Sequence, residues 1–246
     1  MRKLAIAALV TALLTAGVQA QKQPKPWSEW SKKDAEKILN DSPWGQTYTE
    51  TDTSQMFYSP TSDPNTRGRT SNDSSRLGQG ATNTEVHVNF HIRFFTAKPI
   101  RQALVRLMEV NQPNLPKETI ERLNAFANLS SDQYIIVAVA FDATDQRYSG
   151  PVLQAFGSAT TDLAKNNTYL ERKDGKKLFL SEYVPPGKDG FGARFIFSRT
   201  VDGQAFVDAN TGEVRFYTQF AVGSTAIKLD RRFKVSDMMY DGQLEY

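Results

Sequence analysis

Cysteine is absent from the 246-residue chain, and histidine occurs only twice. The absence of cysteine excludes disulfide bonds, thiol nucleophiles, cysteine-ligated zinc and a lipid-modified cysteine behind an N-terminal leader. Net charge is also low, because 30 lysine and arginine residues are balanced by 27 aspartate and glutamate residues. No basic stripe is visible along the chain, so we expect no nucleic-acid partner.

Long apolar runs are missing, with one exception at the N-terminus. Arg2 and Lys3 precede an apolar run at residues 4–14, and small residues follow up to Ala20. This order is that of a secretory signal peptide covering residues 1–20. The run is too short for a membrane span, and no other run approaches the roughly 20 residues required. We therefore expect an exported protein, periplasmic or extracellular, without a transmembrane span after cleavage; a chain without cysteine suits the bacterial periplasm or medium.

The motifs of several enzyme classes are also missing. The sequence contains no Gly-x-Ser-x-Gly, no phosphate loop and no dinucleotide-binding fingerprint. Residues 208–212 space their oxygens like a calcium loop, but Glu213 and Gln219 stand where such a loop requires glycine and glutamate. We interpret this segment as a hairpin turn, and we expect neither a metal nor a cofactor.

The two histidines, His87 and His91, fall in a stretch of alternating polar and apolar residues that predicts a strand. On a strand they share one face but stand roughly 13 Å apart, at about 3.3 Å per residue, which is too far to chelate one ion. Two histidines on a polar face is the favoured interpretation, and a general base remains an alternative. A carboxylate pair is also left open by scattered acidic residues, among them Asp142, Asp145, Glu171 and Glu182.

All three tryptophans lie within residues 27–44, WSEWSKKDAEKILNDSPW. Ser31 and Asp34 form a weak capping box for a short helix, and Pro43 ends it. A helix of under three turns is marginal alone, so it must dock on the rest of the chain. The tryptophans are then either docking anchors or a surface patch for a partner, since aromatic residues dominate interface hot spots. The candidate binding residues are Trp27, Trp30 and Trp44.

Composition divides the chain into four parts. After the leader, residues 21–45 hold the Trp-rich segment with its short helix. Residues 46–83 begin with a threonine- and tyrosine-rich edge strand and continue as a flexible polar loop, which has too few apolar residues to offset the entropy of ordering it. Residues 84–246 form the folded domain.

The folded domain is predicted to be α+β. A strand from Thr84 is followed by helices beginning near Pro99 and Pro116 and by a β-branched run at residues 134–141. A weaker helix is expected over residues 151–165. Asp-Gly pairs at 174–175 and 202–203 then indicate hairpins between short strands, one of which is expected over residues 177–183. We expect an antiparallel sheet meander with two or three helices packed on one face.

Two resemblances accompany these patterns. Trp27, Trp30, the KKDAEKILNDSP run and Trp44, together with residues 237–246, resemble segments of a group of exported bacterial proteins with no assigned function. This resemblance implies export and a shared fold, and it implies no activity. The segment FVDANTGEVRFY, with its D-x-x-T-G-x-V turn, is similar to the hairpin of exported PepSY-type domains, and no function is carried over from it.

The expected function is that of a non-enzymatic binding or structural protein of the cell envelope. Its partner would be a protein or another envelope component, contacted through Trp27, Trp30 and Trp44 or through a pocket between the sheet and the helices. The alternative is an envelope hydrolase that uses carboxylates or a histidine. A third hypothesis is an edge strand at residues 47–58 that extends the sheet of a partner.

Overall fold

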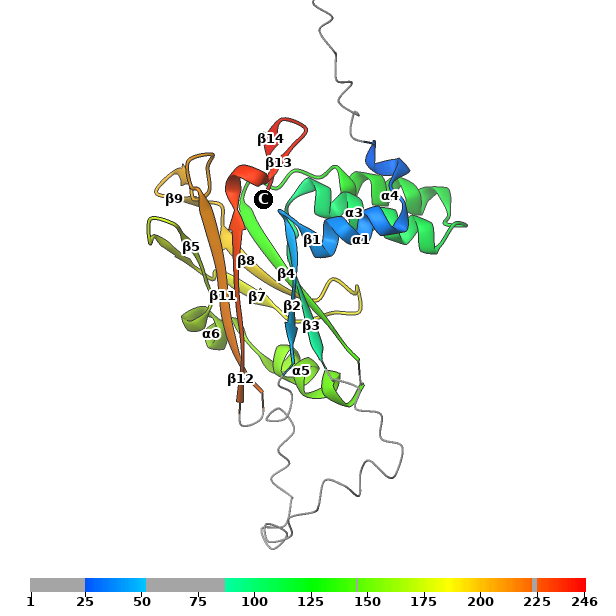
Figure 1. Cartoon of the computed structure of the whole chain (residues 1–246). Coiled ribbons are helices and arrows are strands. Elements are labelled where there is room, and N and C mark those ends of the chain that lie inside the picture. Colours follow the sequence, from blue (N-terminus) through cyan, green and yellow to red (C-terminus); the bar gives the residue numbers. More distant parts are fainter. Residues whose placement is uncertain (1–24, 52–86, 145, 223–224) are drawn as a thin grey trace, which may run out of the picture.

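The computed structural model describes residues 25–51, 87–144, 146–222 and 225–246 (Figure 1). The predicted signal peptide at residues 1–20 and the predicted polar loop at residues 59–83 lie outside this range. Within it the chain forms five α-helices and 14 strands, and all strand pairs are antiparallel. The predicted α+β class is therefore confirmed.

One sheet has six strands in the order β1-β2-β3-β4-β8-β7. Strict alternation in β3 buries Val88, Phe90, Ile92 and Phe94 and turns the intervening polar residues outward. The strands are β1 (Asp41–Ser42), β2 (Gly45–Glu50), β3 (Val88–Phe94), β4 (Tyr134–Ala143), β8 (Ala193–Ser198) and β7 (Glu182–Val184). The strand predicted from residue 46 is present as β2, but the two-residue strand β1 pairs with its start and takes the edge position there. Residues 52–58 of that prediction lie outside the described range.

A second sheet has the order β12-β11-β5-β6. Its strands are β12 (Thr225–Lys234), β11 (Glu213–Val222), β5 (Tyr169–Arg172) and β6 (Lys177–Phe179). Two hairpins complete the strands: β9 (Thr200–Val201) with β10 (Gln204–Ala205), and β13 (Met239–Tyr240) with β14 (Gln243–Leu244). Both Asp-Gly hairpins are confirmed, and Asp202 and Gly203 take the positive φ values of 51° and 77° that such two-residue turns require.

The chain crosses from one sheet to the other directly after β6. We expected a single strand over residues 177–183, but Leu180 donates to Thr168 O near β5, whereas Ser181 donates to Ile196 O of β8. The predicted strand is thus divided into β6 and β7, which belong to different sheets.

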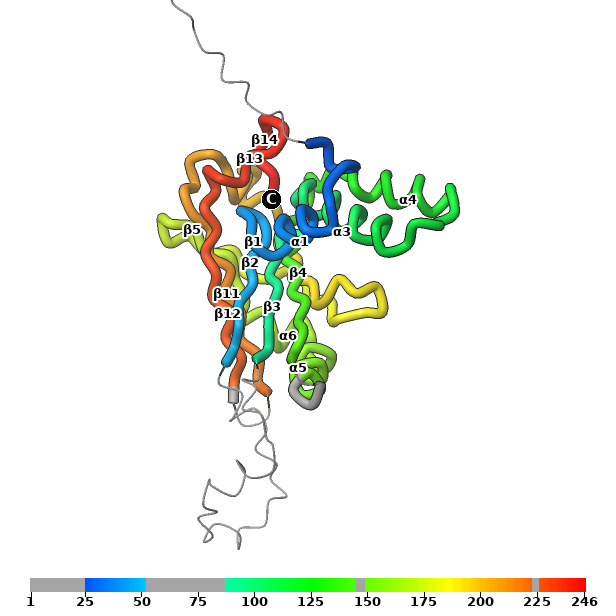
Figure 2. The backbone as a smooth tube through the Cα atoms, turned by 45° about the vertical axis from the view of Figure 1, so that its right-hand side comes forward, coloured from blue at the N-terminus to red at the C-terminus, as the bar shows by residue number. Residues whose placement is uncertain are grey.

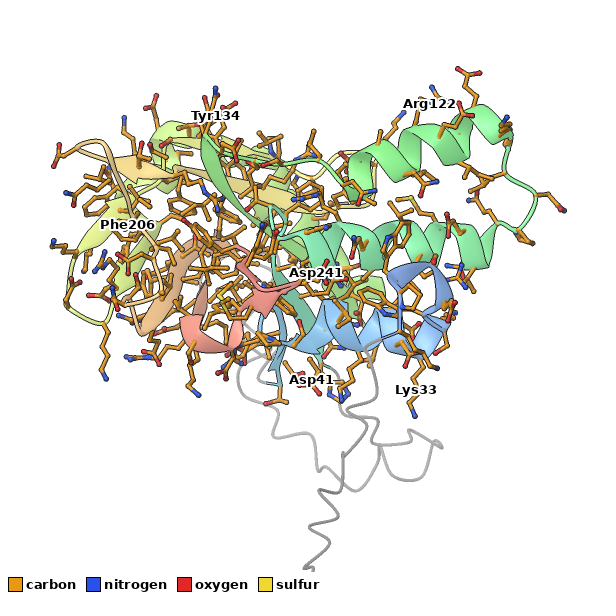
Figure 3. The ribbon with its side chains drawn as sticks, turned by 90° about the horizontal axis from the view of Figure 1, so that it is seen from above. Lys33, Asp41, Arg122, Tyr134, Phe206 and Asp241 are labelled. Carbon is orange, nitrogen blue, oxygen red and sulfur yellow. The ribbon has the colours of Figure 1, made fainter. Side chains whose placement is uncertain are left out.

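The hydrophobic core lies between the inner faces of the two sheets. Phe195 of β8 contacts Phe216 and Phe220 of β11, with ring centroids 5.3 and 5.8 Å apart. Phe156, from α5 (Gln146–Ser158), stacks on Phe220 at 4.6 Å. Figure 3, which views the molecule along the strands, shows side chains filling the space between the sheets. Facing sheets that bury alternate residues in this way form one continuous core.

The helices gather at the two ends of the sheets. At one end lie α1 (Lys32–Asn40), α3 (Lys98–Asn111) and α4 (Lys117–Ala127), and at the other lie α5 and α6 (Thr161–Ala164) (Figures 1 and 2). The helices predicted near Pro99 and Pro116 are confirmed as α3 and α4. The single helix predicted over residues 151–165 is divided in the structure, because α5 begins before Pro151 and ends at Ser158, and α6 follows with Thr160 as its N-cap. Within the described residues, no helix is both long and apolar enough to cross a bilayer.

Candidate binding groove and polar array

The short helix of the Trp-rich segment is capped as the sequence predicts. Ser31 Oγ accepts from the Asp34 backbone N–H, and the Asp34 carboxylate accepts from the Ser31 N–H, at 3.2 and 2.9 Å. These hydrogen bonds lower the pKa of the Asp34 carboxyl. At the other end, Arg93 of β3 donates to Leu39 O and to Asn40 Oδ1 and so satisfies the last turn. Helix α1 is therefore attached to the six-stranded sheet at its C-terminal end.

A close approach of the backbone explains the glycine that follows this helix. A Cβ atom added at Gly45 would lie 2.3 Å from Leu39 O. Strand β2 can therefore start directly beside the end of α1 only because residue 45 has no side chain. This tight connection fixes the position of the preceding residue, Trp44.

The three tryptophans differ in exposure. Trp30 and Trp44 keep only 8% and 6% of their surface exposed, whereas Trp27 is half-buried. The Trp30 indole donates to Lys25 O, and the Trp44 indole donates across 201 residues of chain to Glu245 O at 2.9 Å. Arg106 of α3 holds Trp30 in addition, through a 2.7 Å bond from Nε to its carbonyl. Trp30 and Trp44 are thus anchors of the N-terminal segment.

The same three indoles line one groove with a volume of about 820 Å³. Tyr240 and Met239, on the β13–β14 hairpin, form the facing wall together with residues of α3. The rings of Trp44 and Tyr240 meet edge to face with centroids 6.0 Å apart. Three segments that are distant in the sequence therefore build a single aromatic groove.

Charged and polar groups surround this apolar surface. Lys98 Nζ lies 3.5 Å from Asp241 Oδ2, and Figure 3 places Asp241 beside helices α1 and α3. Tyr240 donates its hydroxyl to Gln102 Oε1 at 2.7 Å. Burial raises the pKa of Tyr240 to about 12, and the charges of Asp241 and Glu245 add to the effect. The phenol is therefore neutral at physiological pH and keeps its hydrogen on Gln102.

Two further lysines, Lys25 and Lys37, line the groove, and neither forms an ion pair within the described part of the chain. The charge of Lys25 nevertheless helps to lower the pKa of the Asp34 carboxyl, which also lines the groove. With Lys98 and Asp241, the lining has three lysines and two aspartates, so its side-chain charge favours an anionic group.

His91 belongs to a polar array on the outer face of the six-stranded sheet. Strand register sets Thr47 opposite His91 and Asn89 opposite Asp142. Thr47 Oγ1 lies 3.0 Å from His91 Nδ1, and His91 Nε2 lies 2.6 Å from Asp142 Oδ2. Asn89 donates to the other oxygen of Asp142 at 3.0 Å. The order hydroxyl, imidazole, carboxylate is that of a nucleophilic triad.

The surroundings of this array differ from those of an active site. The Asp142 side chain is 59% exposed, the Thr47 hydroxyl also reaches Asn40 O at 3.3 Å, and no residue of the array lines the aromatic groove. Partial burial would raise the pKa of Asp142, but hydrogen bonds from His91 and Asn89 outweigh it and hold the pKa below its usual value. The array joins three strands through side chains.

The two remaining acidic candidates that the structure describes, Glu171 and Glu182, do not form a pair. Glu171 binds Arg215 at 2.8 Å, Glu182 is exposed on β7, and Asp145 lies outside the described residues. Among described side chains there is no group of three histidine, aspartate or glutamate residues that could hold a metal ion. Sequence reasoning missed both Thr47 and Asp142 as partners of His91. It also missed Tyr240 and Met239 as the wall facing the tryptophans.

Comparison with protein-family models, with curated proteins and with solved structures found no match.

Proposed function

We propose that this chain is an exported, non-enzymatic binding protein whose aromatic groove holds its ligand. The observation that carries the proposal is the convergence of Trp27, Trp30, Trp44 and Tyr240 on one groove of about 820 Å³. Small-molecule sites are largely apolar concavities of roughly 300–1,000 Å³ with a few placed polar groups. The volume of the groove falls within this range, and its lining likewise combines apolar rings with a few polar side chains.

The groove also indicates the chemistry of its ligand. The indole rings and Met239 favour an apolar body, and the excess of lysine over aspartate in the lining favours an anionic group. The ligand class is therefore an amphipathic anion, as components of a bacterial envelope commonly are. Export rests on the signal-peptide pattern, and N-terminal sequencing of the mature protein should begin at Gln21. A protein that retains Met1 would contradict it.

Intrinsic tryptophan fluorescence tests the groove directly, because the chain has no tryptophan elsewhere. Titration with laurate below its micellar concentration should shift the emission saturably. Trp27→Ala should weaken binding about tenfold or more, as loss of an aromatic anchor does. Trp27 is chosen because it is the least buried of the three, so the fold should survive. Phe179→Ala removes an aromatic ring that is 54% exposed on β6 and serves as the control.

Two results would reject the groove as the site. One is an emission spectrum that laurate leaves unchanged. The other is equal binding by wild type and Trp27→Ala, measured by calorimetry.

The second candidate is a hydrolase, which the contact of His91 with Thr47 and Asp142 favours. If it holds, the protein should hydrolyse p-nitrophenyl acetate, and His91→Gln should abolish the reaction. We expect no such activity, because the array stands on an open sheet face outside the groove.

A further inference from the structure

A second cavity, with a volume of about 300 Å³, adjoins the aromatic groove and shares Lys98 and Asn128 with it. Four separate segments form its walls: the start of α3, the connection from α4 to β4, Arg199 after β8, and the end of β14. Apart from Leu129 and Leu244, the lining residues have polar or charged side chains. The lining of this cavity is thus mainly polar, whereas that of the groove is mainly apolar.

Arg101 is the most unusual side chain in this wall, because it is cationic and only 4% exposed. Its two terminal nitrogens donate to Thr96 O and Leu129 O, which fixes the guanidinium plane. Its Nε is buried and has no hydrogen-bond partner within the described structure. A buried charge that only backbone carbonyls contact is normally matched by a counter-ion.

Arg199 brings a second guanidinium to the same cavity. Its Nη1 donates to the main-chain oxygen of Tyr246 at 3.1 Å, and its Cζ lies 3.8 Å from the centroid of the Tyr246 ring. Burial lowers the pKa of Arg101, Glu245 raises it, and the charge of Arg199 lowers it further. The two cations therefore repel one another across the cavity, and no described carboxylate forms an ion pair with either.

The acidic residues of the lining are already engaged elsewhere. The Asp132 carboxylate accepts from Ser130 Oγ at 2.7 Å. The Glu245 carboxylate accepts from the backbone N–H of Lys98 at 2.9 Å and so caps the N-terminus of α3. Counting side chains alone, the lining has three cations and two carboxylates, and the Glu245 carboxylate raises the pKa of Arg101 more than Arg199 lowers it.

We propose that this cavity binds the oxyanion of a small polar molecule, a phosphate or carboxylate group, between Arg101 and Arg199. Within the described structure, the donors left for such an oxyanion are the unpartnered Nε of Arg101 and the nitrogens of Arg199 other than Nη1. The volume corresponds to about ten water molecules at about 30 Å³ each, so the ligand is small. The site adjoins the groove, but the proposal does not depend on the amphipathic ligand proposed there.

Thermal unfolding of the full chain in sodium phosphate, sodium acetate and sodium chloride, at equal ionic strength, tests the proposal. Phosphate or acetate should raise the melting temperature saturably above that in chloride, because an anion bound only to the folded state stabilises it. Whichever of phosphate and acetate raises the melting temperature more identifies the oxyanion group that the cavity binds. Arg199→Gln is the chosen variant, since it leaves buried Arg101 in place.

Arg199→Gln should weaken the anion affinity about tenfold or more, as loss of a hydrogen bond to a charged group does. Arg199→Lys keeps the charge and loses the guanidinium fork, so its anion affinity should lie between that of the wild type and that of Arg199→Gln. Arg122→Gln is the charge-matched control, because Figure 3 shows Arg122 on α4 pointing away from the rest of the molecule. An equal response to all three salts, or an unchanged response in Arg199→Gln, would overturn the proposal.

Discussion

The contact between His91 and Asp142 could not be predicted from the residues that neighbour His91 in the sequence. Alternation along β3 correctly predicts that His91 lies on the outer face, whereas His87 precedes the strand and its Nδ1 is buried without a partner among the described residues. The carboxylate that pairs with His91 lies 51 residues further on, in β4. Only the register between strands, which depends on the whole sheet, brings the two together. The interpretation of the two histidines as residues of a polar face was therefore incomplete.

Asp142 gives a prediction for the acid side of the stability profile. Its folded-state pKa lies below the ordinary value of 3.8. The stabilisation it provides is therefore complete above that value and is lost as the pH falls through the lower, folded-state pKa. Because the side chain is 59% exposed, the effect should be no more than about 1 kcal/mol.

Urea unfolding between pH 3 and pH 7 measures this effect. Asp142→Asn should reduce the free energy of unfolding at pH 7, and this reduction should shrink as the pH falls below 3.8, so that the two curves converge on acidification. Parallel curves would mean that the bonds from His91 and Asn89 do not favour the charged carboxylate.

At the scale of elements, the four-stranded sheet is joined on its outer face by a row of rings. Register places Tyr169 directly opposite both Phe179 and Tyr217. The two tyrosine rings stack with centroids 5.0 Å apart and planes 16° from parallel. Lys177 Nζ lies 4.2 Å from the Tyr169 ring, and Lys228 Nζ lies 5.4 Å from the Tyr217 ring. A row made of one cation, two stacked rings and a second cation thus crosses all four strands of this sheet, β6, β5, β11 and β12.

Removing a ring from the middle of this row should weaken the sheet. Tyr217→Ala is expected to lower the free energy of unfolding by about 1–3 kcal/mol, from the stacked pair and its cation–π contacts. Tyr134→Ala on β4 is the control, because that ring is 47% exposed. Chemical denaturation of the two variants provides the comparison, and equal losses would deny the row any special contribution.

Most elements follow from local sequence signals, and the main exception follows from a long-range strand pairing. The capping box of α1 and the Asp-Gly turn of β9 and β10 depend on neighbouring residues, and both were predicted correctly. The division into β6 and β7 was not predicted. There the pairing of β7 with β8, a strand further along the chain, overrides the local pattern.

At the scale of the whole molecule, α1 is the element whose role the structure clarifies most. Ala35 is fully buried and Leu39 is 3% exposed, and both belong to the core. Leu39→Ala should therefore lower the free energy of unfolding by about 2–5 kcal/mol, through lost burial and a residual cavity. Leu163→Ala, at a leucine that is 69% exposed on α6, should change it by no more than about 0.5 kcal/mol.

Thermal or urea unfolding of these two leucine variants distinguishes an integral helix from a loosely attached one. Similar stabilities for Leu39→Ala and wild type would mean that α1 detaches without disturbing the core. The sequence predicts that the helix must dock on something, but it cannot name the surface. That surface comprises β2, which follows the helix closely in the chain, and β3 and α3, which residues 88–94 and 98–111 supply from much further along it.

The hydrogen bond from Trp44 to Glu245 also has a consequence for how the protein reaches its native state. Contacts between residues so distant in sequence form slowly, because a long loop must close before they contribute. The groove is therefore completed late in folding, after the sheets have formed from nearer pairs such as β11 and β12. Since every tryptophan of the chain lines that groove, the change in indole emission during refolding reports the last step, while far-ultraviolet dichroism reports the earlier formation of the sheets.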